Sequence, residues 1–141
     1  MMTINHLLKY PERYHRDELA SGVLVVREPC GALSGIVATQ LARHMTNFVE
    51  RHTLGLVSTD PVGYILSRKP DTVRCPDVGF IAWNRVPGGE TPSGFFDTAP
   101  DLAVEVISTN DRIPNVMRKV GEYLAAGTKL VWVIIPLVVP H

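Results

Sequence analysis

Cysteine is scarce in this 141-residue sequence, which contains Cys30 and Cys75 and no others. The two lie far apart and in no metal-ligand spacing, which excludes the paired-cysteine zinc sites of small metal-binding domains. So few cysteines also exclude a scaffold held together by several disulfides. We interpret both as free thiols rather than as a disulfide pair, as is usual in a reducing cytosol.

An excess of charge of one sign is also lacking. Lys+Arg and Asp+Glu each count 14, so the formal net charge is zero. This balance excludes attraction of the whole chain to a polyanion by net charge. Contact with DNA therefore requires a local basic patch, or metal ions that offset an acidic site.

Long apolar segments are missing too. Residues 1–10 lack the charged-then-apolar pattern of a signal peptide. The apolar run at residues 130–139 is interrupted by Pro136 and is too short to span a bilayer. We expect a soluble, cytoplasmic protein with no membrane partner. With 45% hydrophobic and 20% charged residues, the composition is that of one globular domain, residues 1–141.

The hydrophobic pattern predicts strands that alternate with helices. Apolar residues recur at three- and four-residue steps in residues 32–52, which predicts a long amphipathic helix. A second helix is expected between the capping residues Asn110-Asp111 and Gly127, with Pro114 in its first turn. The strand–helix–strand order at the end predicts an α/β fold, a mixed sheet with helices packed on it. Strands are predicted at residues 23–26, 54–58, 62–66, 72–83, 102–108 and 130–135, a short helix or loop at 10–19, and a long loop at 84–100.

Glu105 is the one charge inside the apolar run at residues 102–107. Continuous apolarity predicts a central strand covered on both faces, and an unpaired carboxylate buried there costs several kcal/mol. It therefore needs a cation, a metal ion or a proton. The structural alternative is an ion pair with Arg74, Arg118 or Lys119. The strand pattern alone does not decide between that pair and a metal-binding or catalytic role.

Asp77 and Lys119 are two further candidates. Asp77 follows Pro76 beside an apolar strand, where an aspartate that bonds the local backbone of a turn is the simpler interpretation. Lys119 lies beside the apolar stripe of the second helix, so its amine either extends to solvent or reaches a carboxylate. That stripe consists of Val116, Val120, Tyr123 and Leu124.

Taken together, the three candidates fit a metal-dependent phosphoryl site. Two carboxylates on neighbouring strands, Asp77 and Glu105, can hold Mg²⁺, a hard ion that takes oxygen ligands and keeps several waters. The metal polarises a phosphate and lowers the pKa of its bound water. A nearby Lys119 can position the attacking water or stabilise the charge that develops on the phosphate.

Three segments carry a family resemblance: residues 75–78, 99–108 and 119–134. In order and spacing they resemble the Uma-type putative restriction endonuclease family, a bacterial branch of the PD-(D/E)XK nuclease superfamily. The resemblance covers residues 19–136. It implies a restriction-endonuclease-like fold, in which a mixed central sheet is flanked by helices, and hydrolysis of DNA phosphodiester bonds with Mg²⁺ or Mn²⁺.

The resemblance also implies roles for single residues. Asp77 and Glu105 correspond to the carboxylates of the motif, which bind the metal and take part in catalysis. The superfamily places a lysine two residues after that glutamate, where this sequence has Ile107. Lys119, on the following helix, is then the migrated catalytic lysine.

Relatives often carry a histidine near the start of the first long helix, and this sequence has Ser34 at about that position. Gln40 or His44, beside the apolar stripe of that helix, can take its place. A partly buried polar residue on a helix edge is the simpler interpretation of both.

Relatives also continue for further strands beyond the position of His141, so the chain resembles a truncated member of the family. A truncated sheet exposes an apolar edge, which a partner must cover. We therefore expect a homo-oligomer, a dimer or larger.

Three functions follow from these observations. The first is a Mg²⁺-dependent DNA endonuclease. The second is a catalytically inactive module with the same fold that binds DNA or assembles proteins, which the zero net charge and Ile107 favour. The third is a small α/β protein in which Glu105 forms a structural ion pair.

Overall fold

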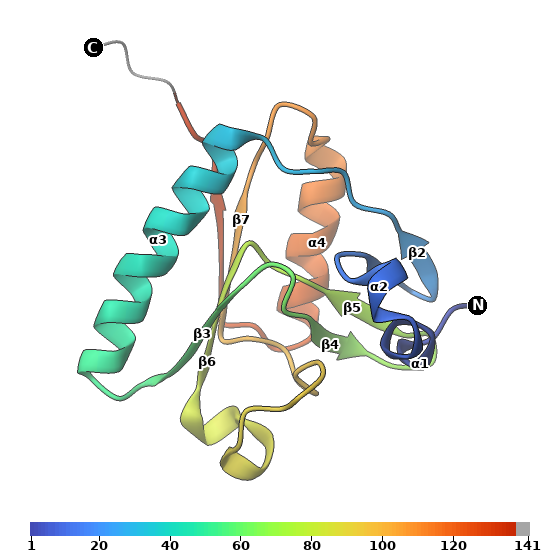
Figure 1. The fold of residues 1–141 in the computed structure, drawn as a ribbon, viewed down its shortest axis with the longest axis horizontal. Coiled ribbons are helices and arrows are strands. Elements are labelled where there is room, and N and C mark those ends of the chain that lie inside the picture. The colour runs from blue at the N-terminus through green and yellow to red at the C-terminus, as the bar shows by residue number, and fades with distance from the viewer. Residues whose placement is uncertain (138–141) are drawn as a thin grey trace.

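Figure 1 shows the computed structural model, which describes residues 1–137; residues 138–141, the end of the predicted domain 1–141, lie outside the described residues. The helices are α1 (Ile4–Lys9), α2 (Pro11–Tyr14), α3 (Ala32–Arg51) and α4 (Ile113–Ala125), with short 3-10 turns η1 (Trp83–Arg85) and η2 (Pro87–Gly89). The strands are β1 (Glu18–Ala20), β2 (Val23–Val25), β3 (Gly55–Thr59), β4 (Tyr64–Ser67), β5 (Thr72–Arg74), β6 (Val78–Ala82), β7 (Leu102–Val106) and β8 (Leu130–Ile134).

The strands form two four-stranded sheets. One has the order β3-β6-β7-β8, in which β7 and β8 run parallel and the other pairs are antiparallel. This is the predicted mixed sheet, and its β7–α4–β8 unit has the predicted strand–helix–strand order. The second sheet, β2-β1-β5-β4, is antiparallel throughout and was not anticipated. Its strand β1 lies in a segment for which a short helix or loop was predicted.

Strand β7 is the centre of the mixed sheet, as its apolar sequence predicted, because β6 and β8 pair with its two sides. Successive side chains of a strand point to opposite faces of a sheet. Val104 and Val106 are buried in the cluster that contacts α3. Glu105 therefore points to the opposite face, where α4 lies (Figure 1).

Helix α3 covers one face of the mixed sheet with the apolar stripe that predicted it. Val37, Leu41 and Met45 pack against the buried valines of β6 and β7. These positions recur at three- and four-residue steps, which puts them on one side of the helix. The first turn of α3 lies near the end of β7, because the Ser34 hydroxyl donates a hydrogen bond to the carbonyl oxygen of Ile107 at 3.1 Å.

The predicted strand at residues 72–83 is wrong as one element, because the chain changes sheets in its middle. β5 belongs to the antiparallel sheet and β6 to the mixed sheet. The buried Pro76 lies between them and has no N–H to continue a ladder. The strands predicted around Asp60-Pro61 likewise belong to different sheets, β3 to one and β4 to the other. Both changes of sheet bring polar residues to the boundary between the sheets.

Helix α4 differs from the predicted helix in its N-cap and in its buried stripe. Its N-cap is Arg112, whereas the Asp111 carboxylate accepts a hydrogen bond from the Ser108 amide at 2.8 Å and closes a turn before the helix. Within the expected inward stripe, Val116 and Tyr123 are buried but Leu124 is exposed. The helix ends near Gly127, whose φ of +103° is a conformation that favours glycine.

Strand β8 forms an exposed edge of the mixed sheet. In residues 1–137 it pairs with β7 and with no second strand. Leu130, Trp132 and Val133 are exposed along it, and Ile135 and Leu137 continue the exposed apolar run. This edge is apolar and open, as the sequence led us to expect for the last strand.

Membrane-spanning segments were searched among the described residues. None of the helices in residues 1–137 is long and apolar enough to cross a bilayer.

Replacing a buried side chain of β6 should measure the packing between the sheets. Ile81 is fully buried and packs with Tyr64, Val86 and Phe96. We expect Ile81→Ala to lower the free energy of unfolding by about 2–5 kcal/mol, because it removes buried apolar contacts and leaves a cavity. Urea denaturation of the variant against Ile36→Ala, at a residue that is 56% exposed, tests this. Equal midpoints for the two variants would contradict it.

Candidate functional site

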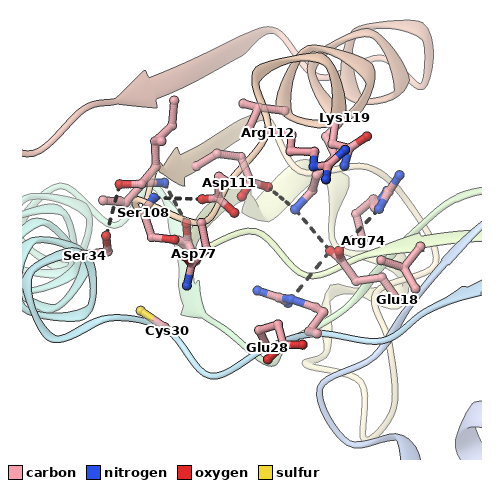
Figure 2. Close-up of a pocket in the computed structure, with 18 of the residues that line it drawn as sticks. Glu18, Glu28, Cys30, Ser34, Arg74, Asp77, Ser108, Asp111, Arg112 and Lys119 are labelled. Atoms are coloured by element: carbon pink, nitrogen blue, oxygen red, sulfur yellow. Dashed lines mark hydrogen bonds and ion pairs between the residues drawn. The ribbon is translucent and has the colours of Figure 1, made fainter.

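A cavity of about 430 Å³ opens between the two sheets and helix α4. Residues of β1, β2 and the segment after β2 form one side, and the end of β7 and the start of α4 form the other (Figure 2). Asp77, Glu105 and Lys119 all line it. The structure therefore brings the three candidates together, although they come from three separate segments of the chain.

Glu105 enters the cavity from the central strand. Its Oε1 accepts a hydrogen bond from the Tyr123 hydroxyl at 2.9 Å and lies 3.0 Å from the Lys119 amine. Burial raises the pKa of Glu105, the positive charge of Lys119 lowers it, and the nearby carboxylate of Asp77 raises it again, with a net pKa of about 7. The carboxyl group is therefore poised to exchange a proton near neutral pH.

Asp77 lies directly before β6, in the segment that passes from one sheet to the other. Its Oδ2 accepts a hydrogen bond from the Val106 amide at 2.6 Å. The side chain thus bonds backbone at the end of β7, and not the backbone of its own turn. Burial raises its pKa, and the bond to Val106 and the charge of Lys119 oppose that rise without cancelling it.

Lys119 projects from α4 toward two carboxylates. Its amine lies 3.0 Å from Glu105 Oε1 and 3.4 Å from Glu18 Oε2. Burial alone would lower its pKa, but the two negative charges outweigh burial and the pKa is raised. The side chain therefore carries a positive charge at the cavity and does not extend freely into solvent.

Glu18 is a site residue that the sequence analysis missed. It is buried on β1, its Oε2 accepts a hydrogen bond from the Cys75 amide at 2.6 Å, and Arg74 lies 3.3 Å from its Oε1. Its pKa is lowered, because the charges of Lys119, Arg27 and Arg74 together outweigh the effect of burial. A carboxylate directly before Leu19-Ala20 is the same kind of signal as Glu105, but three residues are too few for a strand pattern.

Arg27 and Asp60 extend this network to the rim of the cavity. Arg27 donates two hydrogen bonds to the Asp60 carboxylate, at 2.9 and 3.0 Å. Arg16 donates a third at 3.1 Å. Asp60 lies in the short gap between the strands predicted at residues 54–58 and 62–66, and nothing in the local pattern indicates that two arginines bind it.

The two candidate metal ligands each retain one oxygen for a ligand. Oδ1 of Asp77 and Oε2 of Glu105 have no hydrogen-bond partner among the described residues. Both oxygens are accessible from the cavity rather than fully buried. In residues 1–137 the one fully buried side-chain nitrogen or oxygen without a partner is Thr128 Oγ1. Both residues line the cavity, so two hard oxygen donors are available to a cation there. No cluster of three or more metal-ligating side chains occurs in that part of the chain, so a cation needs water or ligand oxygens to complete its shell.

The profile of the Uma2 family, described as "Putative restriction endonuclease", matches residues 4–137. The chain belongs to the Uma2 family. No protein of curated function matches the sequence.

A solved structure similar to this Uma2 chain is a crystal structure from Anabaena variabilis, described as a putative nuclease belonging to DUF820. The two superpose with a TM-score of 0.76 at 21% sequence identity, over 96% of this chain and 74% of that chain. At this level of identity the likeness shows a shared fold. The expected nuclease-like fold is therefore confirmed for this Uma2 chain.

The three candidates on the first long helix lie at different distances from the cavity. Ser34 lines the cavity and bonds the backbone beyond β7. His44 is exposed and contacts Arg43 on its own helix, and the exposed Gln40 lies outside this cavity. The position that the family resemblance gave to a histidine is thus next to the site in this Uma2 chain, and it holds a serine.

The proposed structural ion pair of Glu105 forms with one of its three candidates, Lys119. Arg74 instead donates to Glu122 Oε1 at 2.7 Å and also contacts Glu18. Arg118 lies 3.7 Å from Glu122, one turn away on α4. The Glu105–Lys119 contact is compatible with a structural pair and with a site that uses both groups.

The raised pKa of Glu105 predicts a specific pH dependence of stability. Its ordinary value is 4.5 and its folded value is about 7, so the folded state holds a proton that the unfolded state loses between those values. The contribution of Glu105 to the free energy of unfolding therefore falls as the pH rises. We expect wild type to lose about 2–3 kcal/mol relative to Glu105→Gln between pH 5 and pH 8. Denaturation in EDTA at both pH values measures it, and parallel profiles for the two proteins would refute it.

Proposed function

We propose that this protein is a metal-dependent endonuclease of the PD-(D/E)XK type, which hydrolyses DNA phosphodiester bonds. The observation that carries the proposal is the meeting of Asp77, Glu105 and Lys119 at one open cavity. Membership of a family described as a putative restriction endonuclease supports it. The fold shared with a structure described as a putative nuclease is consistent with it.

The carboxylates of Asp77 and Glu105 are the groups that would hold Mg²⁺ or Mn²⁺. When bound, such an ion polarises a phosphodiester and lowers the pKa of a coordinated water. The Val106 amide fixes one oxygen of Asp77, and Tyr123 and Lys119 fix one oxygen of Glu105. Both ligands are therefore oriented before any ion arrives, which reduces the entropic cost of binding.

Lys119 is the group that would meet the phosphate. Its charge is held at the cavity by Glu105 and Glu18, so an ammonium is available to a non-bridging phosphate oxygen as negative charge develops there. In the hydrolysis a water oxygen bonds to phosphorus and the bond from phosphorus to a sugar oxygen breaks. The leaving oxygen takes up a proton, and the products are a phosphate monoester and a free hydroxyl.

The proposal predicts that cleavage depends on both carboxylates. We expect Asp77→Asn and Glu105→Gln each to lower the cleavage rate of plasmid DNA at least about 100-fold in Mg²⁺, because each removes an anionic metal ligand. Asp101→Asn is the control, since Asp101 is about as buried as Glu105, 6% against 7% exposed, but pairs with Arg85 outside this cavity. Circular dichroism establishes that each variant folds. Undiminished cleavage in both site variants would refute the proposal.

A second function, binding or assembly without catalysis, is favoured by one observation. Glu105 already has an amine at 3.0 Å and a hydroxyl at 2.9 Å, so the carboxylate is partly satisfied without a metal. Titration calorimetry with Mn²⁺ separates the two functions. Wild type that binds no Mn²⁺, with Asp77→Asn behaving identically, supports the second function over the first.

We also propose that the protein is a cytoplasmic homo-oligomer that associates through β8. The exposed strand edge and its apolar side chains support the association, because an open edge presents unpaired backbone groups to another strand. A second copy offers the same edge and can extend the sheet by isologous pairing.

Association through β8 should depend on Trp132. We expect Trp132→Lys to shift the protein toward monomer in light scattering, because it places a charge on the apolar edge. Trp83→Lys is matched in exposure, 40% against 43%, and lies in η1 away from that edge. It should leave the mass unchanged. A wild-type protein that is monomeric at all concentrations would overturn this part of the proposal.

A further inference from the structure

Six cationic side chains line the cavity, and they differ in what already binds them. Arg16 and Arg27 bind Asp60, at 3.1 and 2.9 Å. Of the other four, two are largely buried close to carboxylates, one has a longer contact with a carboxylate, and one has no carboxylate partner within residues 1–137. The full set is Arg16, Arg27, Arg74, Arg112, Arg118 and Lys119.

Arg112 differs from the other five in having no counter-charge within the part of the chain that the structure describes. Arg74 and Lys119 are held by carboxylates at 2.7 and 3.0 Å, and Arg118 has a looser contact at 3.7 Å. Within residues 1–137, Arg112 has no carboxylate within the 4.0 Å of an ion pair. It is also exposed, so its guanidinium can approach a ligand without first leaving a partner.

The backbone that carries Arg112 is nevertheless well fixed. The preceding residue, Asp111, closes a turn with Ser108 through its side chain at 2.8 Å and its amide at 3.1 Å. The carbonyl of Arg112 accepts hydrogen bonds from the amides of Asn115 and Val116, at 3.0 and 3.1 Å. A rigid N-cap therefore presents a free cationic side chain at the wall of the cavity, on the α4 side seen in Figure 2.

Arg112 and Lys119 lie seven residues apart along one helix. At 1.5 Å per residue their backbones are separated by about 10 Å. Successive phosphates of one DNA strand rise by about 3.4 Å. With this separation the two side chains can contact different phosphates of one strand, Lys119 the reacting phosphate and Arg112 a flanking one.

We propose that Arg112 binds a backbone phosphate that flanks the reacting one and so positions the nucleic-acid strand across the cavity. A planar guanidinium can donate two parallel hydrogen bonds to a phosphate, which suits it to this task better than an ammonium. Arg112 is a positioning residue in this arrangement, because it does not touch the reacting atoms. The inference rests on the proposed function in taking nucleic acid as the ligand.

The test measures DNA binding without cleavage, in EDTA. A fluorescent mixed-sequence 20-base-pair duplex is titrated with wild type, Arg112→Ala, Arg112→Lys and Arg51→Ala at several salt concentrations. Loss of one phosphate contact should reduce the slope of log K against log salt by about one for Arg112→Ala. Arg112→Lys keeps the charge and should keep the slope. Arg51→Ala is the matched control, since Arg51 is an exposed arginine at the opposite end of α3 from Ser34.

Each outcome separates this inference from the proposed function. A lower slope for Arg112→Ala, with normal slopes for the other two variants, supports the inference even if wild type cleaves nothing in Mg²⁺. Equal slopes for Arg112→Ala and Arg51→Ala overturn it even if wild type cleaves DNA. Wild type that does not bind the duplex at low salt also overturns it.

Discussion

The buried carboxylate of Glu105 imposes a demand that much of the surrounding structure meets. An uncompensated charge on a central strand costs several kcal/mol, so a cation must reach it. Lys119 reaches it from α4. A lysine in a buried site is itself stabilised in its charged form by a second carboxylate, which Glu18 supplies. Glu18 in turn contacts Arg74. One buried charge thus leads, step by step, to a network that joins β1, β5, β7 and α4 and spans both sheets.

The segment in which the chain changes sheets lies beside this network. Pro76 ends one ladder, and the next residue, Asp77, bonds the Val106 amide at the end of β7. The crossing segment is therefore attached to the central strand at the place where Glu105 enters the cavity. A carboxylate that fastens two elements can keep one oxygen directed at a ligand, which links the stability of the crossing to the geometry of the site.

The sequence was sufficient for the features that depend on local periodicity and insufficient for those that depend on pairing. Glu105 could be predicted because it is a charge within an apolar run. Lys119 could be predicted because it is a lysine beside the apolar stripe of a helix. Glu18 escaped notice because its strand has three residues, and strands that short have no readable alternation. The split of residues 72–83 escaped too, since an apolar run indicates burial in a sheet but not which sheet.

Zero net charge does not argue against an anionic ligand here, because some charges at the cavity are buried and paired whereas others are exposed. The carboxylates of Glu18 and Glu105 are buried and face cations, whereas Arg112 and Arg118 are exposed at the helix side of the cavity. At physiological ionic strength, screening limits exposed charges to about 8 Å. A ligand that approaches the cavity is therefore affected mainly by the exposed charges that line it, which are the two arginines and the exposed carboxylates of Glu28 and Asp111. Acidic residues on distant surfaces have little effect. The local arrangement of charges, with Glu18 and Glu105 buried against cations and Arg112 exposed without a carboxylate partner in residues 1–137, matters more for this site than the sum over the chain.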